Sequence, residues 1–148
     1  MYLDTTLLLK SQIQSTFNTL PAPEQFQIGG IANVRGYPPA EFVCDRGYSF
    51  TGEWSFPTYF AKGIKVPYSK TDFYNALKWV VFYDWANGRI KVPDVNQKRS
   101  KTLSSAGCGW RFNLPEDFSV RFELAWAIND KPSDNYHVHP WCEVSKSF

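Results

Sequence analysis

The stretch Leu77-Lys78-Trp79-Val80-Val81-Phe82-Tyr83-Asp84-Trp85 decides the fold of this 148-residue chain. Large apolar residues stand at every odd position, and the even positions between them include Lys78 and Asp84. Successive side chains of a β-strand point to opposite faces, so this period of two predicts a strand with two chemically different faces.

Five more segments alternate in the same way: residues 7–17, 48–56, 107–113, 120–126 and 141–148. We therefore predict an all-β fold with six antiparallel strands and no helix beyond a short turn near residues 71–75. Each strand is roughly as long as the ~9–11 residues that a tilted strand needs to cross a bilayer. Alternation alone fits two folds. In a soluble sandwich the apolar faces pack on each other, whereas in a membrane barrel they contact lipid.

The expected connections differ in length. Residues 114–117, Leu-Pro-Glu-Asp, predict a tight turn, and residues 129–135 predict a longer polar loop. Asn87-Gly88 is expected to end the third strand, with a polar loop running on to Thr102, and residues 57–76 show no clear pattern. A tight turn among longer loops is typical of outer-membrane barrels.

Composition excludes several classes of protein. The net charge of +2 is too small to favour a nucleic-acid partner, and the basic run at residues 97–101 is interpreted as a solvated loop. No run of apolar residues approaches the ~20 of a transmembrane helix. Aromatic residues make up 18% of the chain, which fits either the aromatic girdles of a barrel or a soluble core.

No candidate metal centre or catalytic group stands out. The cysteines, Cys44, Cys108 and Cys142, match no zinc spacing and are interpreted as small apolar residues. His137 and His139 lack a third ligand and are assigned to a solvated loop. We therefore expect neither a cofactor nor an enzyme.

Four further charged residues are better explained as the polar lining of a channel than as acid–base groups. They are Asp4, Glu53, Arg121 and Glu123.

A motif lies between the first two predicted strands. Val34-Arg35-Gly36-Tyr37 follows Leu20-Pro21, Phe26 and Gly29-Gly30. This frame resembles the two-partner secretion translocators of Gram-negative bacteria, which export haemolysins and filamentous haemagglutinins and share a superfamily with the barrel-assembly insertase. The resemblance covers essentially the whole chain. It implies the C-terminal six strands of a sixteen-stranded transmembrane β-barrel, with a long loop folded into the lumen and the motif at the loop tip.

The resemblance also implies that Arg35 anchors the tip on an acidic partner in the motif Phe82-Tyr83-Asp84-Trp85-Ala86, where Ala86 replaces the family's usual glycine. A buried arginine needs such a partner, and a carboxylate can bind it bidentately. The alternation independently places Asp84 on the polar face, opposite Tyr83. The alternative is that Arg35 and Asp84 are unrelated surface charges.

The glycines of this segment suit a loop that turns sharply or passes close to a wall, although ordinary turns are equally rich in glycine. They are Gly29, Gly30, Gly36 and Gly47. Tyr37 could pack on the barrel wall or lie on the surface.

The end of the chain resembles the C-terminal targeting signal of outer-membrane barrels, which the assembly machinery recognises. Phe148, Val144 and Cys142 fit that pattern, whereas Lys146 departs from it unless it lies near the membrane interface. Residues 1–5 do not resemble a signal peptide. We therefore expect residues 1–148 to be the C-terminal part of a longer translocator.

The resemblance implies transport of a large secreted partner polypeptide across the cell outer membrane. The other expected partners are the assembly machinery and the lipid bilayer. Three alternatives remain open: an insertase of the same superfamily, a soluble all-β module that binds a ligand through its aromatic residues, and a gene remnant without function.

Overall fold

The computed structural model describes residues 4–67, 71–95, 97–115 and 118–147. Six strands form one antiparallel sheet in the order β1-β4-β5-β6-β7-β8. They are β1 (Thr6–Gln14), β4 (Arg46–Pro57), β5 (Leu77–Arg89), β6 (Ser100–Leu114), β7 (Phe118–Ala127) and β8 (Val138–Lys146). The predicted all-β class is confirmed, and each of the six alternating segments forms a strand. The sheet is open, with β1 and β8 at its edges.

Several strand ends differ from the prediction. β5 continues to Arg89 and β6 already begins at Ser100, because Gly88 and Lys101 still pair across the hairpin. Backbone pairing extends here through polar residues, which the side-chain pattern cannot show. β1 ends at Gln14 rather than at residue 17, and β8 begins at Val138. Part of the expected tight turn, Glu116-Asp117, lies outside the described residues.

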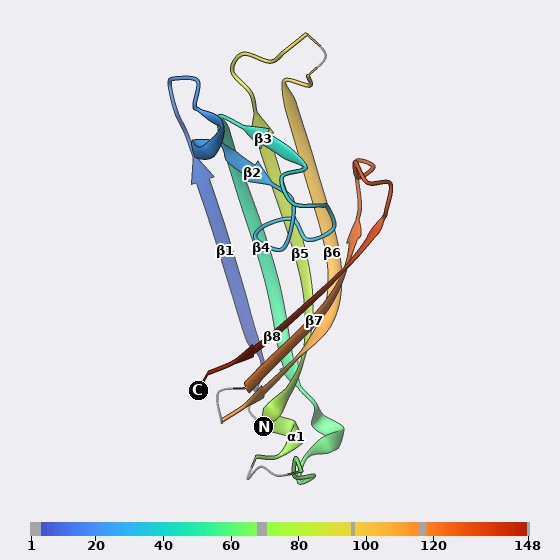
Figure 1. Cartoon of the computed structure of the whole chain (residues 1–148). Coiled ribbons are helices and arrows are strands. Elements are labelled where there is room, and N and C mark those ends of the chain that lie inside the picture. Colours follow the sequence, from blue (N-terminus) through green and yellow to red (C-terminus); the bar gives the residue numbers. More distant parts are fainter. Residues whose placement is uncertain (1–3, 68–70, 96, 116–117, 148) are drawn as a thin grey trace.

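The segment between β1 and β4, residues 15–45, folds back over one face of the sheet. It contains a 3-10 turn, η1 (Ala22–Glu24), and a small hairpin of β2 (Phe26–Ile28) and β3 (Phe42–Cys44). Three residues are too few to display a period, so this hairpin was not predicted. β7 and β8 cross the other strands obliquely, and the curled sheet wraps around the segment (Figure 1).

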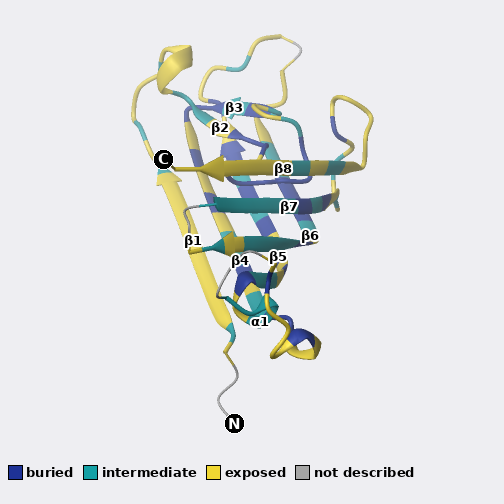
Figure 2. Ribbon diagram, turned by 60° about the horizontal axis from the view of Figure 1, so that its bottom comes forward, coloured by how far each residue is buried: buried dark blue, intermediate teal, exposed yellow. Residues whose placement is uncertain are grey.

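The two faces of the sheet differ in burial. The inner face, which the 15–45 segment covers, carries buried Glu53, Phe82, Asp84 and Glu123. An apolar cluster beneath the segment contains residues of the segment and residues of the sheet region. Its members are Ile28, Val34, Tyr37, Phe42, Cys44, Ala86, Ile90 and Leu103. Figure 2 shows the buried residues concentrated on the strands that the segment covers, and the edge strand β1 largely exposed. The core of this fold therefore lies between a loop and a sheet.

The outer face is apolar and exposed. Tyr48, Trp54, Val81 and Tyr83 lie on it with 39–50% of their surface accessible. The register continues it across the sheet, since Leu7 pairs with Trp54, Trp54 with Val81, and Val81 with Cys108. In the six described strands, outward positions are charged only near strand ends, at Arg46, Arg89 and Lys146.

The β4–β5 connection, at the end of the sheet away from the β2–β3 hairpin, holds two short helical turns (Figure 1). They are η2 (Tyr59–Ala61) and α1 (Phe73–Ala76), the latter close to the expected turn at 71–75. Among the described residues, no helix has the length and apolar character to span a membrane.

Candidate functional site

The backbone around residues 29–37 forms a closed turn. Gly29 and Gly30 have φ angles of 112° and 83°, which favour glycine, as the sequence indicated. Asn33 holds the turn from inside: its Oδ1 accepts from the amides of Gly29 and Val34, both at 2.8 Å. The Gly30 amide donates to the Tyr37 carbonyl at 2.9 Å. This turn presents Arg35 at its tip, and the part of Asn33 was not predicted.

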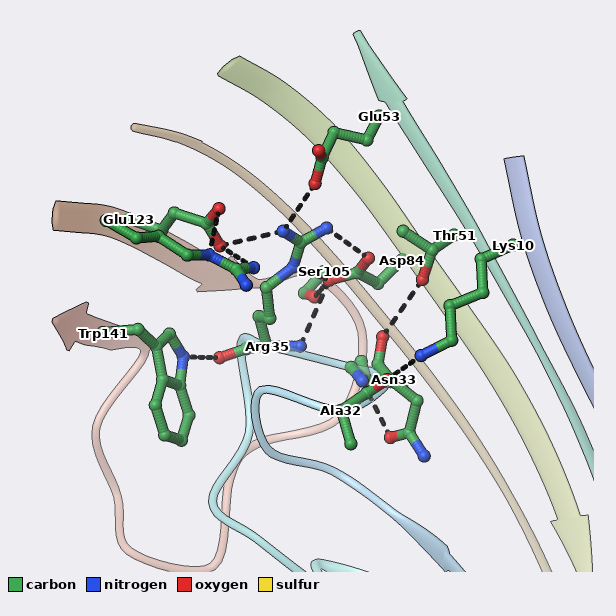
Figure 3. A network of polar contacts seen from close by, with 12 residues as sticks. Lys10, Ala32, Asn33, Arg35, Thr51, Glu53, Asp84, Ser105, Glu123 and Trp141 are labelled. Atoms are coloured by element: carbon green, nitrogen blue, oxygen red, sulfur yellow. Dashed lines mark hydrogen bonds and ion pairs between the residues drawn. The ribbon is translucent and has the colours of Figure 1, made fainter. Parts of the chain in front are cut away.

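Arg35 reaches the inner face of the sheet and binds Asp84 there (Figure 3). Its Nε and Nη2 donate to the two oxygens of Asp84, each at 2.9 Å, and its backbone amide donates to Oδ2 at 3.2 Å. The Arg35 side chain is 3% exposed and that of Asp84 is 0% exposed. The bidentate contact expected from the sequence is therefore present, and the alternative of two unrelated surface charges is wrong.

Two glutamates from other strands also bind the Arg35 guanidinium. Its Nη1 donates to Glu53 on β4 at 3.1 Å and to Glu123 on β7 at 2.9 Å. Both had been assigned to a polar lining in general. The sequence places them on the inward parity of their strands, but only the curvature of the sheet brings them to one point.

Two further arginines complete the cluster. Arg111 contacts Glu53 at 2.6 Å and Glu123 at 2.9 Å, and Arg121 donates to Glu123 at 2.7 Å. Three arginines thus face three carboxylates, and their formal charges cancel. Burial by itself would lower the pKa of Arg35, but the hydrogen bond and charge of Asp84, with those of Glu123, outweigh it and raise that pKa.

The spacing of Phe82 and Asp84 has a direct physical reason. Residues two apart on a strand share a face, so the ring and the carboxylate both point at the loop tip. The Arg35 guanidinium lies 3.4 Å from the centre of the Phe82 ring, a cation–π contact. Gly107, which pairs with Phe82, leaves room for that ring, because a Cβ at Gly107 would come within 2.3 Å of it.

The neighbours of Arg35 fix the tip against β6, β7 and β8. A Cβ at Gly36 would lie 2.6 Å from Ser105 Cβ and 2.8 Å from the Ala127 amide nitrogen, so the close approach requires glycine. The Trp141 indole donates to the Arg35 carbonyl at 2.8 Å.

Tyr37 is fully buried rather than on the surface. Its Oη lies 2.8 Å from Asn129 Oδ1 and 2.9 Å from the Asp130 carbonyl. Burial raises the pKa of Tyr37 to about 12.

Asp45 and Glu41 attach the base of the loop. Asp45 is fully buried and accepts the backbone amides of Leu20 at 3.0 Å and Lys91 at 2.8 Å, and these bonds lower its pKa. Burial by itself would raise the pKa of Glu41, but its bonds to Lys101 and Ser133 outweigh burial and lower it. Neither residue was singled out from the sequence.

The remaining predicted residues lie away from this cluster. Val144 and Cys142 are exposed on β8, and Phe148 lies outside the described residues. His139 was assigned to a loop wrongly, since it lies in β8 with Nε2 2.7 Å from Asp134 Oδ2. Within the described parts of the chain, no group of three or more ligating side chains could hold a metal.

Cys44 is buried beneath the loop, whereas Cys108, like Cys142, is exposed; all three are free thiols. Gly47 lies against the Phe26 ring, where an added Cβ would come within 2.5 Å.

The family model described as the Omp85 superfamily domain matches residues 3–142. No curated protein matches the chain.

Proposed function

The chain belongs to the Omp85 superfamily, and on that premise we propose that its sheet is part of the wall of an outer-membrane barrel that transports or assembles proteins. Members of this superfamily are outer-membrane β-barrel proteins of Gram-negative bacteria. In the proposed arrangement the outer face of the sheet contacts lipid and the inner face lines the lumen. The 15–45 segment then lies inside the lumen.

The observation that carries this proposal is the distribution of charge between the two faces. The outer face is uncharged except near strand ends, whereas on the inner face three buried carboxylates pair with three arginines. A solvated surface does not need to exclude charge, but a lipid-facing surface does, because Arg or Lys there costs about 2–4 kcal/mol at the bilayer midplane. Aromatic pairs such as Tyr48–Trp85 and Trp110–Phe122 lie on the same face.

The cluster gives the loop a specific role in this proposal. Arg35 is the only cation of the described loop that contacts Asp84. Glu53 also binds Arg111, and Glu123 also binds both Arg111 and Arg121. If the loop left the inner face, Asp84 would therefore lose its cation, whereas Glu53 and Glu123 would keep theirs. Such a contact favours one docked position of the loop over many loose ones.

Fractionation of cells of the source strain tests the location of the protein. We expect it in the outer-membrane fraction, resistant to urea extraction. Val81→Arg, on the outer face, should reduce membrane recovery, whereas Lys62→Arg, which keeps a charge on an exposed connection, should not. Recovery of the wild-type chain in detergent-free buffer would contradict the proposal and favour the soluble all-β module.

We further propose that the polypeptide handled is a large secreted partner, as in two-partner secretion. This rests on the motif frame around Arg35 and on Phe82-Tyr83-Asp84. Deletion of the gene in its source strain, followed by proteomics of the medium and the outer membrane, tests it. Loss of one large polypeptide from the medium supports secretion. A general loss of barrel proteins from the outer membrane would support the insertase instead.

A further inference from the structure

Four basic side chains, one from the start of β4 and three from residues 89–99, line one cavity of about 250 Å³ at the end of the sheet that carries the β2–β3 hairpin. They are Arg46, Arg89, Lys91 and Arg99. The sequence had suggested only the solvated run at 97–101. Strand pairing gathers the cations: Arg46 and Arg89 are register partners, and the Ile90 amide donates to the Arg99 carbonyl at 2.8 Å.

Neutral carbonyl oxygens, rather than carboxylates, accept the side-chain hydrogen bonds of two of the four cations. Arg46 Nε donates to the Thr16 carbonyl at 2.5 Å and Lys91 Nζ donates to that of Phe17, so neutral acceptors position both cations. The nearby carboxylate of Asp45 is buried, and its oxygens already accept the Leu20 and Lys91 amides. Among the described residues, no carboxylate forms an ion pair with Arg89 or Arg99. Like charges placed directly opposite on paired strands are unfavourable unless a counter-charge joins them.

The position of the cavity indicates an amphipathic ligand. Arg46 and Arg89 share the outward parity of the sheet, and the ring pair Tyr48–Trp85, with centroids 5.1 Å apart, begins the apolar face directly beside them. A molecule with acyl chains along that face would bring its headgroup to the four cations. Basic pockets at a membrane surface recognise phosphorylated headgroups in this way.

The proposed function, on which this inference rests, indicates which leaflet of the outer membrane the cavity faces. Short turns of outer-membrane barrels are periplasmic and longer loops extracellular. β6 ends at Leu114 and β7 begins at Phe118 at the end of the sheet opposite the cavity, whereas the longer β5–β6 and β7–β8 connections lie near the cavity. The long β4–β5 connection is the exception (Figure 1). We propose that the cavity binds the phosphate groups of the phosphorylated glycolipid that forms the outer leaflet.

Binding of lipopolysaccharide to the chain in uncharged detergent micelles tests the proposal. The test variant Arg89→Gln/Arg99→Gln removes two cavity cations, and the control Lys98→Gln/Lys131→Gln removes two exposed loop cations at the same end. We expect about thirtyfold weaker binding for the test variant, from about 1 kcal/mol per contact, and unchanged binding for the control. Circular dichroism of both variants should match the wild type.

Three outcomes would overturn the inference. Equal losses in the two variants would mean attraction by net charge alone. Equal binding of dephosphorylated lipopolysaccharide would mean that phosphate is not recognised. Displacement by low concentrations of inorganic pyrophosphate would reassign the cavity to a free phosphate ligand. Outer-membrane recovery of the test variant, measured separately, distinguishes failure of this site from failure of the proposed function. Weakened lipopolysaccharide binding with normal recovery concerns the cavity alone, whereas absence of the wild type from the outer membrane contradicts the proposed function.

Discussion

Arg35→Ala is the substitution with the clearest expected consequence. It removes the bidentate contact to Asp84 and leaves that fully buried carboxylate with only a backbone amide and the Ser105 hydroxyl, at 3.2 and 3.3 Å. Breaking a buried pair from one side costs about 3–5 kcal/mol, because the remaining charge stays desolvated. Glu53 and Glu123 should add little to that cost, since Arg111 and Arg121 still bind them.

The free energy of unfolding in urea, followed by tryptophan fluorescence in detergent micelles, measures this loss. Arg111→Ala is the matched control. The Arg111 side chain is 28% exposed, and the two glutamates that it binds would still be paired with Arg35, so we expect the free energy of unfolding to fall by only about 1 kcal/mol. The double variant Arg35→Leu/Asp84→Leu removes both charges and should recover about half of the single loss or more. If the losses of Arg35→Leu and Asp84→Leu simply add in the double variant, pairing with Asp84 is not what makes Arg35 important.

Three other perturbations test the loop. Gly36→Ala should destabilise the fold by about 1–3 kcal/mol in the same urea titration, because its Cβ would overlap Ser105 and the Ala127 backbone, whereas Gly52→Ala, with nothing nearer than 3.6 Å, should not; equal effects would contradict the close approach. Tyr37→Phe should cost about 1 kcal/mol and increase protease cleavage of the 15–45 segment, through loss of the bonds at Asn129 and Asp130; unchanged cleavage would show that the hydroxyl does not hold the loop. The lowered pKa of Asp45 means that its contribution is complete above its ordinary value of 3.8 and is lost as the pH falls below it, so acid should increase loop cleavage in the wild type. In the Asp45→Asn variant, the protease should cleave the 15–45 segment faster at neutral pH, and that part of the acid dependence of cleavage should disappear. If the pH profile of cleavage in this variant equals that of the wild type, Asp45 is not the cause.

Much of the candidate site could be read from the order of residues along single strands. The alternation around Leu77–Trp85 fixes the face of Asp84, and the same parity puts Phe82 beside it. Strand ends were less predictable, because the pairing of Gly88 with Lys101 depends on the partner strand and not on either side chain. Each strand of the β2–β3 hairpin has only three residues, which is too few to show a period of two in the sequence. Its existence becomes clear only from the structure, in which it packs on β4 and β5.

The sequence by itself determined the all-β class and the apolar and polar faces of each strand, because these follow from a period of two. The pairing of Arg35 with Asp84 was expected from the resemblance to a known family, and the alternation added only that Asp84 lies on the polar face. Only the tertiary structure decided which other charges meet Arg35. Glu53 and Glu123 lie 18 and 88 residues from it, and the register and curl of the sheet bring them to the same guanidinium. The same holds for the four cations of the cavity, since the pairing of β4 with β5 brings Arg46 opposite Arg89. Contacts of this kind depend on the spatial neighbours of a strand, and local sequence does not encode them.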